Sequence, residues 1–202
     1  MTIDEIMRAA PVIPVLVLEE EMDWAALAAT FVAGGLPVLE VTLRTPLALD
    51  AIRGMAEVPG AIVGAGTVLN EAQLAQAIDA GSKFIVSPGL TNPLALAARD
   101  TAVPFLPGVA TAADIMRGID VGLDRFKFFP AVTSGGIPAL NALSGPFGNI
   151  RFCPTGGVRA ETAAEWLALP SVLCVGGTWF VKPGDDLATI RERACAAAAL
   201  AG

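Results

Sequence analysis

The chain has 202 residues, of which 54% are hydrophobic and 16% charged, a balance that excludes a disordered protein. Its net charge of −7 argues against nucleic-acid binding, which needs a basic surface, but is compatible with a locally basic site for a small anion. The sequence has no histidine and no tyrosine, which excludes a Ser-His-Asp triad, a histidine-ligated metal and a histidine general base.

The sequence also argues against a membrane or secreted location. Every apolar run is interrupted by glycine, proline or a charge before the roughly 18 residues that a membrane-spanning helix needs. Residues 1–5 carry acids where a secretion signal would carry bases. Cys153, Cys174 and Cys195 are an odd number without CxxC spacing, and the first two lie in apolar runs as small core residues. We therefore expect a cytoplasmic protein with reduced cysteines.

One unit recurs along the chain: a short apolar run, a turn with small or polar residues, and an alanine- and leucine-rich helical stretch. Residues 24–32 and 73–78 are examples of the helical stretches. Residues 195–200 are expected in the last helix. Residues 3–10 are expected to form a short helix that caps the bottom of the fold. Helix ends are marked by Gly34-Gly35, Gly81 and Gly122. The apolar runs cover residues 12–17, 38–43, 62–66, 84–87, 105–109, 126–129, 150–154 and 172–176.

Near-continuous apolar strands that alternate with helices indicate a parallel sheet covered by helices. Eight such units in one domain predict an α/β fold, a (β/α)8 TIM barrel spanning residues 1–202. An open doubly wound sheet is the alternative, but no GxGxxG motif follows the first strand.

In such a barrel the active site lies at the carboxyl ends of the strands, where Lys127 and Glu40 are the leading catalytic candidates. Lys127 alternates with Phe126 and Phe128, so it is expected to point into the barrel while the phenylalanines face the helices. Burial favours the free amine, which is the nucleophile that condenses with a ketone. Glu40 shares the interior face of its strand and could move protons for that reaction. The alternative is a structural ion pair, of Lys127 with an interior carboxylate or of Glu40 with Arg44 or Lys127, and an ion pair and a catalytic role could hold at once.

Arg44 and Thr67 are candidates for binding a substrate carboxylate, because arginine offers a two-pronged donor and threonine a hydroxyl. The alternatives are a salt bridge at the rim for Arg44 and a helix N-cap for Thr67. Pro88 and Phe129 are expected to line an apolar wall, with simple packing as the alternative.

Two glycine pairs follow the last two strands, where barrels often bind phosphate through backbone N–H groups. They are Gly156-Gly157, preceded by Thr155, and Gly176-Gly177, followed by Thr178. Ordinary turn chemistry is the alternative, but the repetition on both strands favours a binding role for Thr155, Gly156, Gly157, Gly177 and Thr178.

Five motifs resemble the bacterial aldolases of 2-keto-3-deoxy-6-phosphogluconate (KDPG) and 4-hydroxy-2-oxoglutarate (KHG), over essentially the whole chain. They occupy residues 38–45 (VLEVTLRT), 63–70 (VGAGTVLN), 87–91 (SPGLT), 126–131 (FKFFPA) and 151–157 (RFCPTGG).

This resemblance implies a class I carbon–carbon lyase of the Entner–Doudoroff pathway, a homotrimer that needs no metal or other cofactor. Lys127 matches the Schiff-base lysine and Glu40 the general acid/base. Arg44 and Thr67 match the groups around the pyruvate carboxylate, and Pro88 and Phe129 match pocket walls. Thr155, Gly156, Gly157 and Thr178 match the phosphate and specificity end.

Two positions depart from the family pattern: Val132 stands where members commonly have glutamate, and Thr178 where many have serine. Thr155 fits the gluconate enzyme, whereas a related galactonate aldolase tends to lack that hydroxyl.

The expected reaction is cleavage of KDPG, a small anionic keto-acid phosphate, to pyruvate and glyceraldehyde 3-phosphate, with the galactonate analogue as the alternative substrate. Other readings are a Schiff-base dehydratase or decarboxylase, a phosphate-binding isomerase or epimerase without a covalent intermediate, and a non-catalytic barrel.

Overall fold

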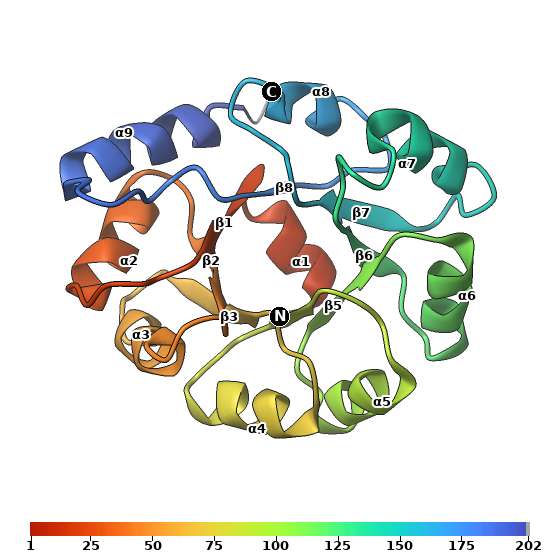
Figure 1. Ribbon diagram of the computed structural model, residues 1–202, viewed down its shortest axis with the longest axis horizontal. Helices are drawn as coiled ribbons and strands as arrows, with labels where there is room; N and C mark the ends of the chain where they lie inside the picture. The colour runs from red at the N-terminus through yellow and green to blue at the C-terminus, as the bar shows by residue number, and fades with distance from the viewer. Residues whose placement is uncertain (201–202) are drawn as a thin grey trace.

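The apolar runs form eight parallel strands in a ring, and helices surround the ring (Figure 1). The computed structural model describes residues 1–200, so residues 201–202, the end of the expected domain, lie outside the described residues. The strands are β1 (Val12–Leu16), β2 (Val38–Thr42), β3 (Ile62–Gly66), β4 (Ile85–Ser87), β5 (Phe105–Val109), β6 (Arg125–Phe128), β7 (Arg151–Pro154) and β8 (Val175–Gly177). The helices are α1 (Ile3–Arg8), α2 (Trp24–Ala33), α3 (Ala48–Ala56), α4 (Glu71–Asp79), α5 (Asn92–Thr101), α6 (Ala112–Asp120), α7 (Gly136–Ser144), α8 (Ala163–Leu167) and α9 (Leu187–Ala198).

The sheet closes on itself. Its strand order is β7-β6-β5-β4-β3-β2-β1-β8, and all the pairs are parallel. Isolated bridges from Phe152 to Val172 and from Thr155 to Gly176 join β7 to the β8 segment. The (β/α)8 prediction is therefore confirmed, and the open doubly wound alternative is wrong.

The observed elements differ from the predicted ones mainly at their ends. β8 begins at Val175 rather than at residue 172, because Val172 makes only an isolated bridge to Phe152. Helix α1 ends at Arg8, with Ala9 as its C-cap, so the predicted range 3–10 was too long. Helix α9 begins at Leu187, well before residue 195, because the side chain of Asp186 caps its first turn.

Two apolar clusters make up the core. The larger one lies between strands and helices and includes Val41, Phe126 and Phe128. The smaller one fills the lower barrel interior, where Ile6 and Met7 of α1 pack with Phe84 and with the buried thiols of two cysteines (Cys153 and Cys174). Helix α1 crosses the centre of the ring in Figure 1, so it closes the bottom of the barrel as expected.

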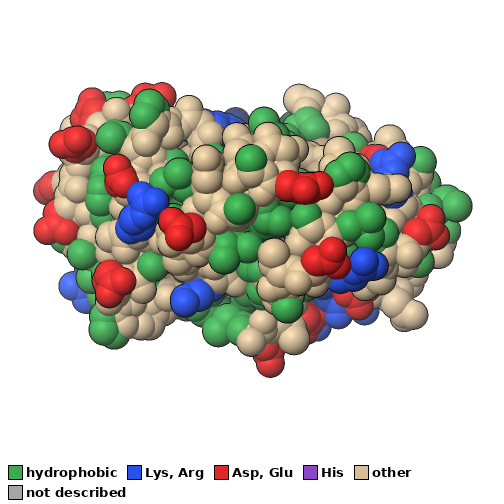
Figure 2. Space-filling model, turned by 90° about the horizontal axis from the view of Figure 1, so that it is seen from below, with side chains coloured by type: hydrophobic (Ala, Val, Ile, Leu, Met, Phe, Trp, Pro, Cys, Tyr) green, Lys and Arg blue, Asp and Glu red, His purple; other side chains and the backbone are tan. Residues whose placement is uncertain are grey.

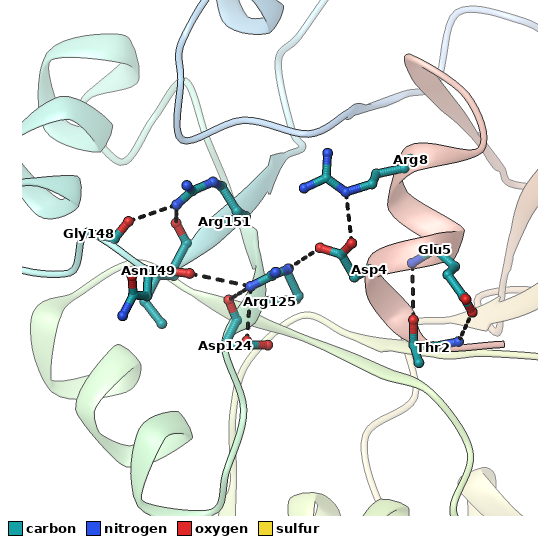
Figure 3. A network of polar contacts seen from close by, with 10 residues as sticks. Thr2, Asp4, Glu5, Arg8, Asp124, Arg125, Gly148, Asn149 and Arg151 are labelled. Atoms are coloured by element: carbon teal, nitrogen blue, oxygen red, sulfur yellow. Dashed lines mark hydrogen bonds and ion pairs between the residues drawn. The ribbon is translucent and has the colours of Figure 1, made fainter.

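A polar network fixes α1 to the barrel (Figure 3). Arg125, the first residue of β6, donates from Nε to Asp4 Oδ1 at 2.6 Å. Arg8 donates from Nε to the other oxygen of Asp4 at 2.8 Å. Because Arg125 lies two residues before Lys127 on the same strand, α1 holds the amino end of the strand that carries the candidate nucleophile.

The surface in Figure 2, on the side of the ring where α4 lies, mixes acidic, basic and apolar side chains rather than presenting a continuous basic face. Within residues 1–200, no helix combines the length and the apolarity that crossing a membrane requires.

Candidate active site

Lys127 and Glu40 meet inside the barrel. Their side chains come from β6 and β2, and the residues are only 5% and 3% exposed. Lys127 Nζ lies 2.8 Å from Glu40 Oε1 and 3.1 Å from Oε2. The predicted inward direction of both side chains is confirmed, and Glu40 pairs with Lys127, not with Arg44.

Strand alternation explains why both groups point inward. Phe128 packs toward Trp166 of α8, with ring centroids 6.5 Å apart, and Phe126 lies against Gly118 of α6. These contacts place the phenylalanines outside the barrel and Lys127 inside. An amine and a carboxylate in contact and shielded from water can exchange a proton, which frees the amine to attack a carbonyl carbon.

Phe129 lies beside this pair, and Pro88 lies next to the neighbouring strand β5. The ring centroid of Phe129 is 5.4 Å from Lys127 Nζ. The carbonyl group of Pro88 packs directly on Gly108, which pairs in register with Lys127. Phe129 therefore lies beside the amine, and Pro88 lies against the strand that pairs with β6.

Arg44 and Thr67 come together at the carboxyl ends of β2 and β3. Arg44 Nε donates to Thr67 Oγ1 at 3.2 Å. Thr67 is not the N-cap of α4, because Asn70 has that role and accepts from the N–H of Gln73. Within the described residues Arg44 makes no ion pair, so neither alternative for these two side chains holds. An exposed guanidinium steadied by a hydroxyl suits a substrate carboxylate.

The loops after β7 and β8 also lie side by side, because Thr155 bridges to Gly176. Thr155 is buried, and its hydroxyl makes two long contacts, a hydrogen bond of 3.4 Å to the Cys153 carbonyl and a contact of 3.8 Å with the Cys153 thiol. Gly156 and Gly157 have φ values of 96° and 80°, a left-handed conformation that glycine adopts without strain. Thr178 is exposed at the end of β8. The structure thus brings together the residues predicted to bind phosphate.

Two contacts in this region were not predicted. The ring of Trp179 lies directly against Gly177. Val132 packs on Gly157, where an added Cβ would be 2.7 Å from Val132 Cγ2, and the Val132 N–H donates to the Gly156 carbonyl at 3.0 Å. An aromatic residue directly after Gly-Gly-Thr was the available signal for Trp179. Within residues 1–200, no group of three or more histidine, cysteine or acidic side chains is arranged to hold a metal ion.

Comparison with known proteins identifies the family. The sequence model that describes KDPG and KHG aldolases matches residues 3–192. The chain belongs to the KDPG and KHG aldolase family. The resemblance inferred from the motifs is therefore confirmed.

Several members of this aldolase family are very similar to the chain. The 2-dehydro-3-deoxy-phosphogluconate aldolase of Zymomonas mobilis is 57% identical over 98% of this chain and 95% of its own length. The KHG/KDPG aldolase of Escherichia coli K12 is 52% identical over 91% of this chain and 86% of its own. A crystal structure of the Legionella pneumophila KDPG aldolase, with pyruvate captured as a covalent carbinolamine intermediate, is 42% identical, covers 98% of both chains and superposes with a TM-score of 0.92.

Proposed function

We propose that this chain is a class I aldolase that cleaves KDPG to pyruvate and glyceraldehyde 3-phosphate and also acts on 4-hydroxy-2-oxoglutarate. The observation that carries the proposal is the buried contact between the amine of Lys127 and the carboxylate of Glu40, at 2.8 Å. Such a pair supplies a nucleophile and a proton carrier in one place, which is what Schiff-base formation needs. The names of the Zymomonas and Escherichia relatives support this substrate class.

The reaction begins when Lys127 passes a proton to Glu40 and its free amine attacks the C2 carbonyl of the substrate. The carbinolamine receives a proton from Glu40 and loses water, which leaves an iminium ion joined to Lys127. Glu40, now a carboxylate again, takes the C4 hydroxyl proton, the C3–C4 bond breaks with its electron pair moving onto the iminium, and the aldehyde leaves. Glu40 then protonates the resulting enamine at C3, and water hydrolyses the pyruvate iminium. The carbinolamine of the Legionella enzyme supports the first step.

The remaining site residues bind the two anionic ends of the substrate. Arg44 and Thr67, which are in contact at 3.2 Å, bind the carboxylate. Pro88 and Phe129 form the wall beside the reacting carbons. The phosphate lies against the glycine-rich turns after β7 and β8 and the hydroxyls beside them: Thr155, Gly156, Gly157, Gly177 and Thr178. The Thr155 hydroxyl favours the gluconate over the galactonate substrate.

We further propose that the aldolase works as a cytoplasmic homotrimer without a metal or other cofactor. The trimer rests on the family resemblance, and light scattering of the purified protein checks it. The two buried free thiols, those of Cys153 and Cys174, are compatible with a reducing compartment.

Borohydride reduction in the presence of pyruvate tests the mechanism. We expect a stable adduct on Lys127, located by mass spectrometry of peptides, and loss of both adduct and activity in Lys127→Ala. Turnover without a reducible adduct would instead indicate an isomerase or epimerase. Pyruvate release from the phosphorylated gluconate and galactonate substrates, measured side by side, determines the preferred substrate.

A further inference from the structure

The last residue of β3, Gly66, lies directly beside the carboxylate of Glu40. In the register of β2 and β3, Glu40 pairs with Gly64 and Thr42 with Gly66. The Glu40 side chain leans toward the carboxyl end of the barrel and occupies the space in front of Gly66. A Cβ added to Gly66 would lie 2.7 Å from Glu40 Cγ and 2.8 Å from Cδ, and closer still to Oε1. Carbon atoms in van der Waals contact are about 3.5–4.0 Å apart, so a methyl group and this carboxylate cannot share the space.

The backbone conformation at position 66 does not require glycine. Gly66 is part of a regular parallel strand, and its φ lies outside the left-handed region, so the conformation itself would accept alanine. The three heavy atoms nearest to the added Cβ all belong to Glu40. The closest obstacle to a side chain at position 66 is therefore one side chain, that of the proposed proton carrier.

Gly64, on the same face of β3, differs in this respect. A Cβ there would lie 2.6 Å from carbon atoms of the Phe84 ring, which belongs to the cluster above α1. Gly64 thus makes room for packing in the lower barrel, whereas Gly66 makes room for the carboxylate at the level of Lys127.

We propose that Gly66 is a positioning residue: its missing side chain lets Glu40 reach Lys127 in the geometry that proton transfer requires. This inference rests on the proposed function of the Lys127–Glu40 pair. With alanine at position 66, the carboxylate must rotate away, and its two contacts with Nζ, at 2.8 and 3.1 Å, cannot both persist. The substitution leaves the side chains of Arg44 and Thr67, the proposed site of the substrate carboxylate, unchanged.

The test is a double-mutant cycle of the full chain: wild type, Gly66→Ala, Glu40→Ala and the double variant. Steady-state cleavage of KDPG and exchange of the pyruvate methyl protons in D2O are measured for each. We expect Gly66→Ala to lower kcat and the exchange rate by about 100-fold or more, with a much smaller change in KM. In the Glu40→Ala background the same substitution should lower both rates by no more than about two-fold, because the atoms that it would meet are gone.

Equal fold losses in the two backgrounds would overturn the proposal, because they would mean that Gly66 acts independently of Glu40. Gly148→Ala is the matched control: a Cβ there meets no atom within 4 Å and its φ lies outside the left-handed region, so we expect unchanged rates.

If Gly66→Ala does not fold, thermal unfolding of Glu40→Ala and of the double variant provides the test. We then expect the double variant to fold and to melt within about 2 °C of Glu40→Ala. A double variant that also fails to fold overturns the proposal. The proposed function fails separately, if the wild type does not cleave KDPG or if Glu40→Ala keeps full activity.

Discussion

Lys127 Nζ lies within 3.1 Å of both carboxylate oxygens of Glu40, in the barrel interior where the two residues are 5% and 3% exposed. Removal of one partner leaves the other as a buried, unpaired charge, which commonly costs about 3–5 kcal/mol. We therefore expect Lys127→Met to lower the free energy of unfolding by about this amount. Replacement of both groups, in Lys127→Met/Glu40→Leu, should recover most of the loss, because two apolar side chains need no partner. Urea denaturation of the variants measures both effects.

The control for this prediction is Lys83→Met, because Lys83 is exposed. We expect it to change the free energy of unfolding by less than about 0.5 kcal/mol. A Lys127→Met variant as stable as this control would contradict the view that the pair is buried and mutually dependent. None of the variants that lack Lys127 should form a borohydride adduct with pyruvate, whatever their stability.

Thr67 has a φ of 59°, a left-handed conformation that is unfavourable for a β-branched residue. Strain of this kind costs about 1–3 kcal/mol and is concentrated at functional sites. We expect Thr67→Gly to melt at the same temperature as the wild type or higher, because relief of strain offsets the flexibility of glycine. Its KM for the keto-acid substrate should rise several-fold, because the Thr67 hydroxyl no longer accepts from Arg44.

Ala102→Gly separates the relief of backbone strain from the loss of the Thr67 hydroxyl. Ala102 has a similar φ of 56°, but it lies at the exposed C-cap of α5. We expect it to gain stability without a change in KM. A Thr67→Gly variant with unchanged KM and kcat would remove Thr67 from the substrate site.

The fold and much of the site could be predicted because they depend on local patterns. Period-two alternation placed Lys127 inside the barrel and the flanking phenylalanines outside, and the β/α repeat predicted the barrel. The ion-pair partner of Glu40 could not be predicted. The choice between Arg44 and Lys127 depends on the register of β2 within the closed ring. The N-cap of α4 stayed open in the sequence for a local reason: Thr67 and Asn70 are both good N-cap residues, and only the backbone shows that α4 begins after Asn70.

Asp4 gives a pH-dependent prediction for the helix that closes the barrel. Hydrogen bonds from Arg8 and Arg125 hold the pKa of Asp4 below its usual value of 3.8, although partial desolvation opposes this shift. A carboxyl group with a depressed pKa stabilises the folded state fully above its unfolded pKa, and this contribution is lost as the pH falls through the folded pKa. We expect wild type to melt higher than Asp4→Asn by a constant margin above about pH 5, and the margin to shrink as the pH falls below about 4.

Melting curves of both proteins across this pH range check the prediction. Asp100→Asn is the control, because Asp100 makes only an exposed pair with Arg99, in which its side chain is 70% accessible. A margin that grows on acidification would show that Asp4 does not anchor α1 as a carboxylate.

The three thiols should react at very different rates. Cys195 is exposed on α9, whereas Cys153 and Cys174 are buried in the barrel above α1. A contact with the Cys153 thiol and complete burial raise the pKa of Cys174 well above its ordinary range, which suppresses its reactive thiolate. We expect an aromatic disulfide reagent to modify Cys195 rapidly in the native protein, and Cys153 and Cys174 only after denaturation.

Cys195→Ser removes the rapid phase and isolates the buried thiols. Their residual reaction then reports how often the bottom of the barrel opens, because Ile6 and Met7 of α1 pack against the same cluster. Weakening the anchor of α1 with Asp4→Asn should accelerate this slow phase, whereas Asp100→Asn should leave it unchanged. Equal slow-phase rates in Cys195→Ser and Cys195→Ser/Asp4→Asn would mean that the thiols become accessible by a route other than the release of α1.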